Sequence, residues 1–258
     1  MLVLSNISKT FNIGTQHQVK ALSSINITFN PREWTYIIGG NGSGKTTLIK
    51  IIMGDVKPDD SGTVLLNNSN ITKKDLHQRA HIFHYIEQNT DANLVNSMTI
   101  YENLILGLNS NGSLLHDFKL YKRKKLREKA KEILKNFSLN LEKRLDVQVR
   151  MLSGGEKQAV VAAKSMMIKP LVLLIDEFTS ALDQKLAPRI LRLLKEYTKQ
   201  YNITVIIVTH DYNFIEDTGE RVILLDNGKI VDDFSKRDQE LTEKYILEKF
   251  HEQKNQNY

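Results

Sequence analysis

The sequence contains no cysteine among its 258 residues. Disulfide bridges and thiolate metal sites are therefore excluded, which is compatible with a reducing compartment. Long apolar runs are also missing, since the longest lie near Leu171–Ile175 and Ile203–Val208 and a membrane-spanning helix needs roughly 18 apolar residues. Met1–Thr10 lacks the basic start and the apolar stretch of a secretory leader. From these absences we expect a chain that stays in the cytoplasm and does not itself cross a membrane.

Acidic residues are in modest deficit, with 30 Asp and Glu against 36 Lys and Arg, which gives a net charge of +6. A basic excess can indicate a polyanionic partner. Much of the excess lies in Lys122–Lys125 and the stretch after it, where Glu128 and Glu132 are interspersed in a helix-like pattern. A solvated helix face and a surface that contacts phosphate or lipid both remain open for this segment. We expect no nucleic-acid partner.

Hydrophobic periodicity predicts strands at both ends of the chain and helices between them. Apolar and polar residues alternate over Leu2–Ile7 and Ser24–Phe29, as in half-buried strands. Apolar strand runs return at 171–175, 204–208 and 222–225, with a helical stretch between the first two. Helical patterns occupy about 91–169, most clearly 100–108 and 124–137. Strands that alternate with helices indicate an α/β fold with a largely parallel sheet.

A glycine-rich segment lies between the predicted strand Trp34–Ile38 and the predicted helix Lys45–Met53. Its sequence matches G-x-x-x-x-G-K-S/T, the P-loop pattern, in the strand-to-helix context that supports it, and its residues are Gly39, Gly40, Asn41, Gly42, Ser43, Gly44, Lys45 and Thr46. Backbone N–H groups of such a loop point at phosphate oxygens. Lys45 would supply charge to the terminal phosphates, Thr46 would bind Mg²⁺, and Thr47 would add a donor. The alternative, a glycine-rich turn without a ligand, does not account for the lysine and threonine.

Two carboxylates follow the apolar run Leu171–Ile175. The end of a parallel strand lies at the sheet edge where ligands bind, so Asp176 and Glu177 would lie beside the P-loop. Asp176 would hold Mg²⁺ through water, and Glu177 would act as the base for, or orient, the water that attacks the terminal phosphorus. The alternative is that the two carboxylates only cap the next helix.

A second candidate anion site precedes the predicted helix Lys157–Ile168. Ser153, Gly154 and Gly155 form a helix start that can bind an anion, although a plain N-cap is the alternative. Together with Leu152 and Glu156, they resemble the signature motif of the ABC ATPase family, in which the fifth residue is usually Gln. In that family the motif closes over the terminal phosphate of ATP held by a partner's P-loop. The resemblance therefore implies a head-to-tail dimer of two copies of this chain around two ATP molecules.

Four further residues occur in the family's order. Gln88 resembles the glutamine that touches Mg²⁺ or the attacking water and senses the permease. Asp183, in Ser180–Asp183, resembles the loop that crosses the dimer, and His210 resembles the switch histidine that contacts the terminal phosphate. Phe11 occupies the position of the family's adenine-stacking ring, although a core position is the alternative.

The resemblance implies a single ABC ATPase domain over residues 1–258. A P-loop NTPase core with a mostly parallel sheet and an N-terminal antiparallel β-subdomain would occupy 1–88 and 170–235. An inserted α-helical subdomain with the signature would occupy 89–169, and a C-terminal helix and tail would occupy 236–258.

The resemblance further implies an ATPase that drives separate transmembrane permease subunits from the cytoplasmic face of the cell membrane. Ser97–Asn103 resembles the face on which permeases dock. Arg144–Ser153 is loosely similar to cassettes of bacterial uptake systems, some of them linked to aromatic amino acids, so we expect import with an extracytoplasmic solute-binding protein. A soluble ATPase of iron-sulfur cofactor assembly is the alternative. The sequence does not name the solute.

Overall fold

The computed structural model describes residues 1–59, 61–106, 108, 120–178, 186–212, 214–238 and 240–256, without the side chains of 120–122 and 250–256. The strands are β1 (Leu2–Phe11), β2 (Val19–Phe29), β3 (Trp34–Ile38), β4 (Thr63–Leu66), β5 (Ser69–Asn70), β6 (Phe83–Ile86), β7 (Val172–Asp176), β8 (Thr204–Thr209), β9 (Arg221–Asp226) and β10 (Lys229–Ser235). The α-helices are α1 (Lys45–Met53), α2 (Leu76–Arg79), α3 (Thr90–Asn93), α4 (Ile100–Leu106), α5 (Leu120–Lys135), α6 (Gly154–Ile168), α7 (Leu186–Gln200), α8 (Ile215–Thr218) and α9 (Glu243–Gln256). Short 3₁₀ turns are η2 (Leu141–Lys143) and η3 (Val149–Met151).

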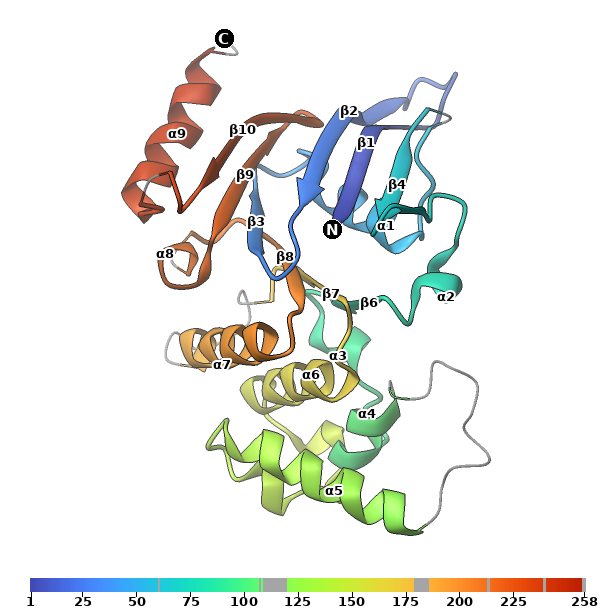
Figure 1. Cartoon of the computed structure of the whole chain (residues 1–258), viewed down its shortest axis with the longest axis vertical. Coiled ribbons are helices and arrows are strands. Elements are labelled where there is room, and N and C mark those ends of the chain that lie inside the picture. The colour runs from blue at the N-terminus through green and yellow to red at the C-terminus, as the bar shows by residue number, and fades with distance from the viewer. Residues whose placement is uncertain are drawn as a thin grey trace.

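The strands form two sheets (Figure 1). The six-stranded sheet has the order β10-β9-β3-β8-β7-β6 and is parallel except for β10. The four-stranded sheet has the order β2-β1-β4-β5 and is antiparallel. The predicted α/β class, with a mostly parallel sheet and an N-terminal antiparallel sheet, is therefore confirmed.

Strand alternation divides the apolar interior between the two faces of the larger sheet. Successive strand residues point to opposite faces, and parallel strands are apolar on both. In β3, Ile37 packs in a cluster with α1 and the smaller sheet. Its neighbours Tyr36 and Ile38 belong to the second cluster, which includes α6 and α7. The larger sheet is thus held between α1 and the β-rich part on one face and the longer helices on the other.

Helices α3 to α6 form the lower lobe in Figure 1. Leu104 of α4, Leu134 of α5 and Val161 of α6 are buried in one cluster. The signature helix α6 begins at Gly154, three residues before the predicted start at Lys157. The reason is that Ser153 is its N-cap and accepts a hydrogen bond from the Glu156 N–H, which stabilises the first turn.

The sequence analysis predicted no strand after residue 225 and therefore missed β10. β10 pairs antiparallel with β9 through a tight turn at Asn227 and Gly228, whose φ angles are 45° and 74°. Asn-Gly is the preferred pair for a two-residue hairpin because both residues tolerate positive φ. This signal was present in the sequence and was not used.

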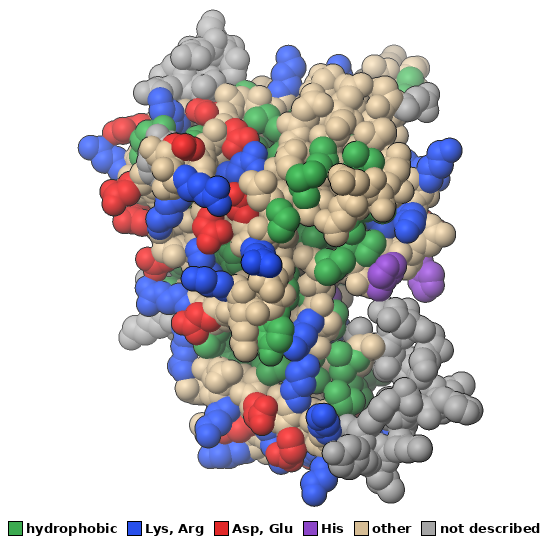
Figure 2. Space-filling model, in the orientation of Figure 1, with side chains coloured by type: hydrophobic (Ala, Val, Ile, Leu, Met, Phe, Trp, Pro, Cys, Tyr) green, Lys and Arg blue, Asp and Glu red, His purple; other side chains and the backbone are tan. Residues whose placement is uncertain are grey.

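Of the described helices, none is both long and apolar enough to cross a bilayer. Figure 2 shows Lys and Arg interspersed with Asp and Glu over one face of the molecule. Two of the cations in α5 are paired, Lys131 with Glu128 at 2.9 Å and Arg127 with Asp146. Neighbouring carboxylates thus neutralise part of the positive charge of this basic segment, as expected for a solvated helix face.

Candidate nucleotide-binding site

The predicted P-loop joins the end of β3 to the start of α1 and is tightly constrained by its surroundings. Gly44 has φ of 104°, and a Cβ there would lie 2.5 Å from the carbonyl oxygen of Ala21. A Cβ at Gly39 would lie 2.1 Å from the carbonyl oxygen of Leu225. Only glycine fits such a conformation and such close approaches. The glycines therefore let the loop pass close to the backbones of β2 and β9 before α1 begins.

Lys45 is the first residue of α1 and is only 7% exposed. Its Nζ donates hydrogen bonds of 2.9 Å to the carbonyl oxygens of Gly39 and Gly40. Burial lowers its pKa, and the negative charges of Glu177 and Asp176 oppose that change. The loop therefore holds a partly desolvated ammonium group close to the sites where phosphates would bind.

The P-loop lines a hollow of about 370 Å³, within the range of small-molecule sites. Its lining residues are Phe11, Val19, Ala21, Asn41, Gly42, Ser43, Gly44, Lys45, Thr46, Thr47 and Glu177. The ring of Phe11 at the end of β1 is 36% exposed, with Lys9 Nζ 5.6 Å from its centroid. The exposed ring is therefore not a core residue, and the adenine contact stays a prediction.

Glu177 and His210 meet at the carboxyl ends of β7 and β8. Glu177 has φ of 46°, and its N–H donates to the carbonyl oxygen of Val208 at 2.9 Å. Its Oε1 lies 2.9 Å from His210 Nδ1. A non-glycine residue in the left-handed region is strained, and such strain is often found at functional sites. The sequence predicted Glu177 as the base and His210 as a contact to the terminal phosphate, and the structure adds that these two side chains meet.

Tyr85 was missed by the sequence analysis. Its hydroxyl donates a hydrogen bond of 3.0 Å to Oδ2 of Asp176, which is 8% exposed at the end of β7. Burial raises the pKa of Asp176, and the hydrogen bond from Tyr85 opposes that rise. The available signal was a tyrosine three residues before Gln88, but its partner depends on β6 lying next to β7.

Asp176 and Thr46 were predicted to hold Mg²⁺, and both carry side-chain oxygen atoms, which is the donor type that Mg²⁺ takes. Among the described residues, no group of three or more His, Cys, Asp or Glu side chains could hold a metal ion. Mg²⁺ at a nucleotide site needs only one or two carboxylates, because phosphates and water complete its shell. Burial raises the pKa of the Asp176 carboxyl, but the positive charge of Lys45 acts against that rise and so favours the charged form. This carboxylate therefore fits a nucleotide-bound Mg²⁺.

Several predicted site residues lie apart from this hollow. Gln88 is exposed after β6, on a segment where Asn93 donates to the Glu87 carbonyl at 2.9 Å and accepts from its N–H at 3.0 Å. Neither Gln88 nor His210 is among the residues that line the hollow. Asp183 lies outside the described residues. The described part of one chain thus assembles the P-loop with Phe11 and Glu177, but not every predicted residue.

The signature residues lie on α6 in the lower lobe (Figure 1) and do not line the hollow either. Ser153 is exposed at the helix start. A Cβ added to Gly154 would have no neighbour within 4 Å, whereas one on Gly155 would lie 2.8 Å from Leu186 Cδ2. The start of α6 therefore lies at an open surface of this chain.

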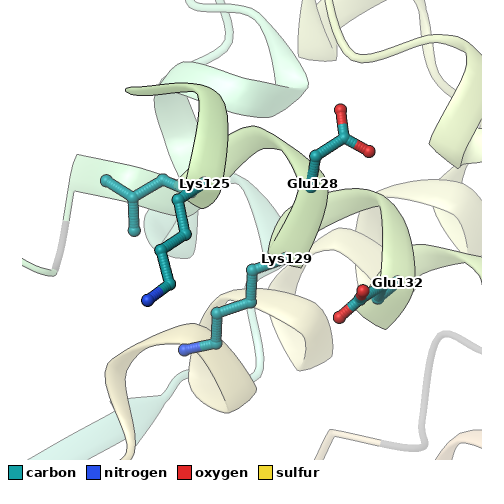
Figure 3. Close-up of a pocket in the computed structure, with 5 residues that line it drawn as sticks. Lys125, Glu128, Lys129 and Glu132 are labelled. Carbon is teal, nitrogen blue, oxygen red and sulfur yellow. The ribbon is translucent and has the colours of Figure 1, made fainter. Parts of the chain in front are cut away.

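A larger hollow, of about 590 Å³, lies along α5 (Figure 3). It is lined by Lys125, Leu126, Glu128, Lys129 and Glu132. The side chains of Lys125 and Lys129 extend in the same direction, and Glu128 points away from them. None of the predicted site residues lines it. We place the nucleotide at the smaller hollow because phosphates need the loop N–H groups and Lys45.

Comparisons with known proteins show which family the chain belongs to. Residues 22–180 match the family model described as ABC transporter. A tyrosine transport ATP-binding protein of Clostridioides difficile is 36% identical over 251 residues, which are 97% of this chain and 98% of that protein. The methionine import ATP-binding protein MetN 1 of Enterococcus faecalis is 33% identical, over 95% of this chain and 68% of its own length.

A solved structure shows the same likeness in three dimensions. A dimeric ATP-binding cassette in a post-hydrolysis state, bound to ADP and Pi, superposes with a TM-score of 0.77 and 30% identity. The match covers 91% of this chain and 98% of that one. With the P-loop geometry, the paired Glu177 and His210 and these relatives, the chain belongs to the ABC transporter family and is one of its ATP-hydrolysing, ATP-binding subunits.

Proposed function

We propose that two copies of this chain close head-to-tail around ATP and Mg²⁺ and thereby drive solute import through separate permease subunits at the cytoplasmic face of the cell membrane. The observation that carries the proposal is the division of the site. The hollow at the P-loop holds Lys45 and Glu177, while Ser153 lies on the open start of α6 and does not line it. A second copy would bring the missing helix start to the phosphates.

Each residue has a distinct role in this proposal. The P-loop N–H groups and Lys45 bind the phosphates, and Phe11 stacks on the base. Glu177 accepts a proton from the attacking water, with His210 hydrogen-bonded to it at 2.9 Å and able to orient it. Thr46, Asp176 and Gln88 would hold Mg²⁺, which neutralises charge that develops during phosphoryl transfer.

Contacts between α3 and α6 provide a route from Gln88 to the signature. Lys157 of α6 pairs with Asp91 of α3 at 2.7 Å. Lys164 of α6 donates to the carbonyl oxygen of Asn93 at 2.8 Å. Because α3 begins two residues after Gln88, a displacement at Gln88 would move α6. We propose that this path links nucleotide state to the permease.

We place the permease contact on Ser97–Asn103, a segment that ends in the first turn of α4. Thr99 and Glu102 bond to each other at this helix start, with Thr99 Oγ1 2.9 Å from a Glu102 oxygen. The buried Asn103 amide donates to the carbonyl oxygens of Val95 and Thr99, each at 3.0 Å. These bonds make the segment rigid, and a rigid surface can pass force from a docked partner.

The solute is proposed from the relatives. The proteins named above serve tyrosine transport and methionine import, so we propose an amino acid, delivered by an extracytoplasmic solute-binding protein. The same relatives favour transport over iron-sulfur assembly.

The permease proposal is tested by affinity purification of the tagged chain from gently solubilised membranes in ATP, followed by mass spectrometry. We expect a polytopic membrane protein to be recovered with the chain. The variant Glu102→Lys, which reverses one charge within Ser97–Asn103, should no longer recover it. Recovery of soluble scaffold proteins alone would instead support the assembly alternative, with the ATPase chemistry unchanged.

The head-to-tail dimer is tested by Ser153→Arg. The variant should bind ATP with unchanged affinity, since its P-loop is intact, yet remain a monomer because the larger side chain blocks the phosphate from the start of α6. Fluorescent-nucleotide titration and sedimentation velocity measure the two properties separately. An ATP-induced dimer of normal affinity in this variant would contradict the proposed geometry.

A further inference from the structure

We propose that Arg144 is a positioning residue that acts through Glu156. It neutralises the carboxylate at the fifth position of the signature, so that Ser153 and the start of α6 can accept the terminal phosphate held by a second copy of the chain. The inference rests on the proposed head-to-tail dimer and adds a residue to its machinery.

Glu156 holds Ser153 in a closed set of hydrogen bonds. The Ser153 N–H donates to Glu156 Oε2 at 2.9 Å, and the Ser153 hydroxyl donates to the same oxygen at 3.1 Å. The Glu156 N–H donates back to Ser153 Oγ at 3.4 Å. This is a capping box, which Glu and Gln can both form. The carboxylate thus fixes the position of Ser153, and the hydroxyl would have to turn its proton from Oε2 to a phosphate oxygen when a phosphate binds.

A carboxylate at this position creates an electrostatic conflict. Its negative charge is stabilised by the start of α6, which is also where the phosphate would bind, and two anions in one place repel each other. Glu156 is ionised here. Burial opposes ionisation, but the Ser153 N–H, Arg144 and the Ser153 hydroxyl together lower the pKa of its carboxyl. A Gln would avoid the conflict because it is neutral.

Arg144 resolves the conflict. Its Nη1 donates to Glu156 Oε1, the oxygen that Ser153 does not use. The Arg144 side chain is 36% exposed and that of Glu156 is 20% exposed, so solvent screens the pair only in part. The guanidinium thus offsets the charge of Glu156 and leaves its Oε2 to hold the backbone N–H of Ser153.

The experiment compares four forms of the chain in the Glu177→Gln background, which retains ATP: the parent, Arg144→Gln, Glu156→Gln and the double variant. Sedimentation velocity with ATP and Mg²⁺ gives the dimer dissociation constant of each. Two copies of the pair occur per dimer and each is partly exposed, so we expect Arg144→Gln to weaken the dimer about tenfold. The double variant should return to within about threefold of the parent, because no charge is left to neutralise.

Salt and a conservative variant separate this role from a structural one. The defect of Arg144→Gln should shrink in high salt, which screens repulsion between partly exposed charges. Arg144→Lys, which keeps the charge, should dimerise within about threefold of the parent. The matched control is Arg127→Gln, which breaks a pair with Asp146 in the same lobe and should leave the dimer unchanged.

Three outcomes would overturn the proposal while leaving the dimer standing. The first is normal dimerisation of Arg144→Gln. The second is a double variant no better than Arg144→Gln, which would mean that Arg144 contacts the phosphate directly or only supports the fold. The third is failure of Arg144→Lys. If the parent itself does not dimerise with ATP, the proposed function fails and this inference fails with it.

Discussion

Glu177→Gln should lower the rate of ATP hydrolysis by about 10³-fold, which is the scale of a lost general base, and should accumulate an ATP-bound dimer. The amide cannot accept the proton of the attacking water, yet it can still hydrogen-bond His210, which lies 2.9 Å from the present carboxylate. The phosphate contacts of Lys45 and the P-loop remain. Phosphate release measures the first effect and sedimentation velocity measures the second.

The fold should not suffer from this change. Glu177 and Asp176 repel each other, since the charge of Glu177 helps to raise the pKa of Asp176. Removing one charge should therefore leave the melting temperature unchanged or slightly higher. Glu216→Gln on α8 is a suitable control, because it removes an exposed carboxylate from outside the site. Hydrolysis at the normal rate in Glu177→Gln would exclude Glu177 as the base.

Lys45→Ala should weaken ATP binding by about 100-fold or more, because each hydrogen bond to a charged group contributes about 1.5–3 kcal/mol. The Lys45 ammonium is held by the carbonyl oxygens of Gly39 and Gly40, within the loop that would surround the phosphates. Isothermal titration of a nucleotide measures the loss directly. The rise in melting temperature that ATP produces in the parent should also disappear, since a ligand that does not bind cannot stabilise the fold.

Lys50→Ala is the matched control for this prediction. Lys50 lies on the same helix, its side chain is 48% exposed, and its partner Asp55 is 4.0 Å away. The change removes the same charge from α1 without touching the loop, so ATP affinity should stay within about twofold of the parent. Equal loss in both variants would show that net charge, and not the position of Lys45, governs binding.

Much of this site was predictable from sequence because its parts are local. The P-loop pattern is eight consecutive residues, so the pattern and its place between β3 and α1 could be read directly. Asp176 ends the buried strand β7 and Glu177 follows it directly, so this pair could also be read from the local sequence. The α/β class followed from apolar strand runs that alternate with helices, because the spacing of apolar residues differs between strands and helices.

Tertiary structure decided which distant side chains meet. Tyr85 contacts Asp176, 91 positions away, because β6 lies next to β7, and Glu177 meets His210 because β8 lies on the other side of β7. Arg144 reaches Glu156 only through the packing of the helical lobe. Strand order and helix packing follow from burial across the whole chain, which no local pattern encodes. Sequence by itself therefore determined the P-loop pattern and the two carboxylates at the end of a strand, because both are local. The fold determined how those carboxylates are supported and that the signature lies outside the hollow, because both depend on packing across the whole chain.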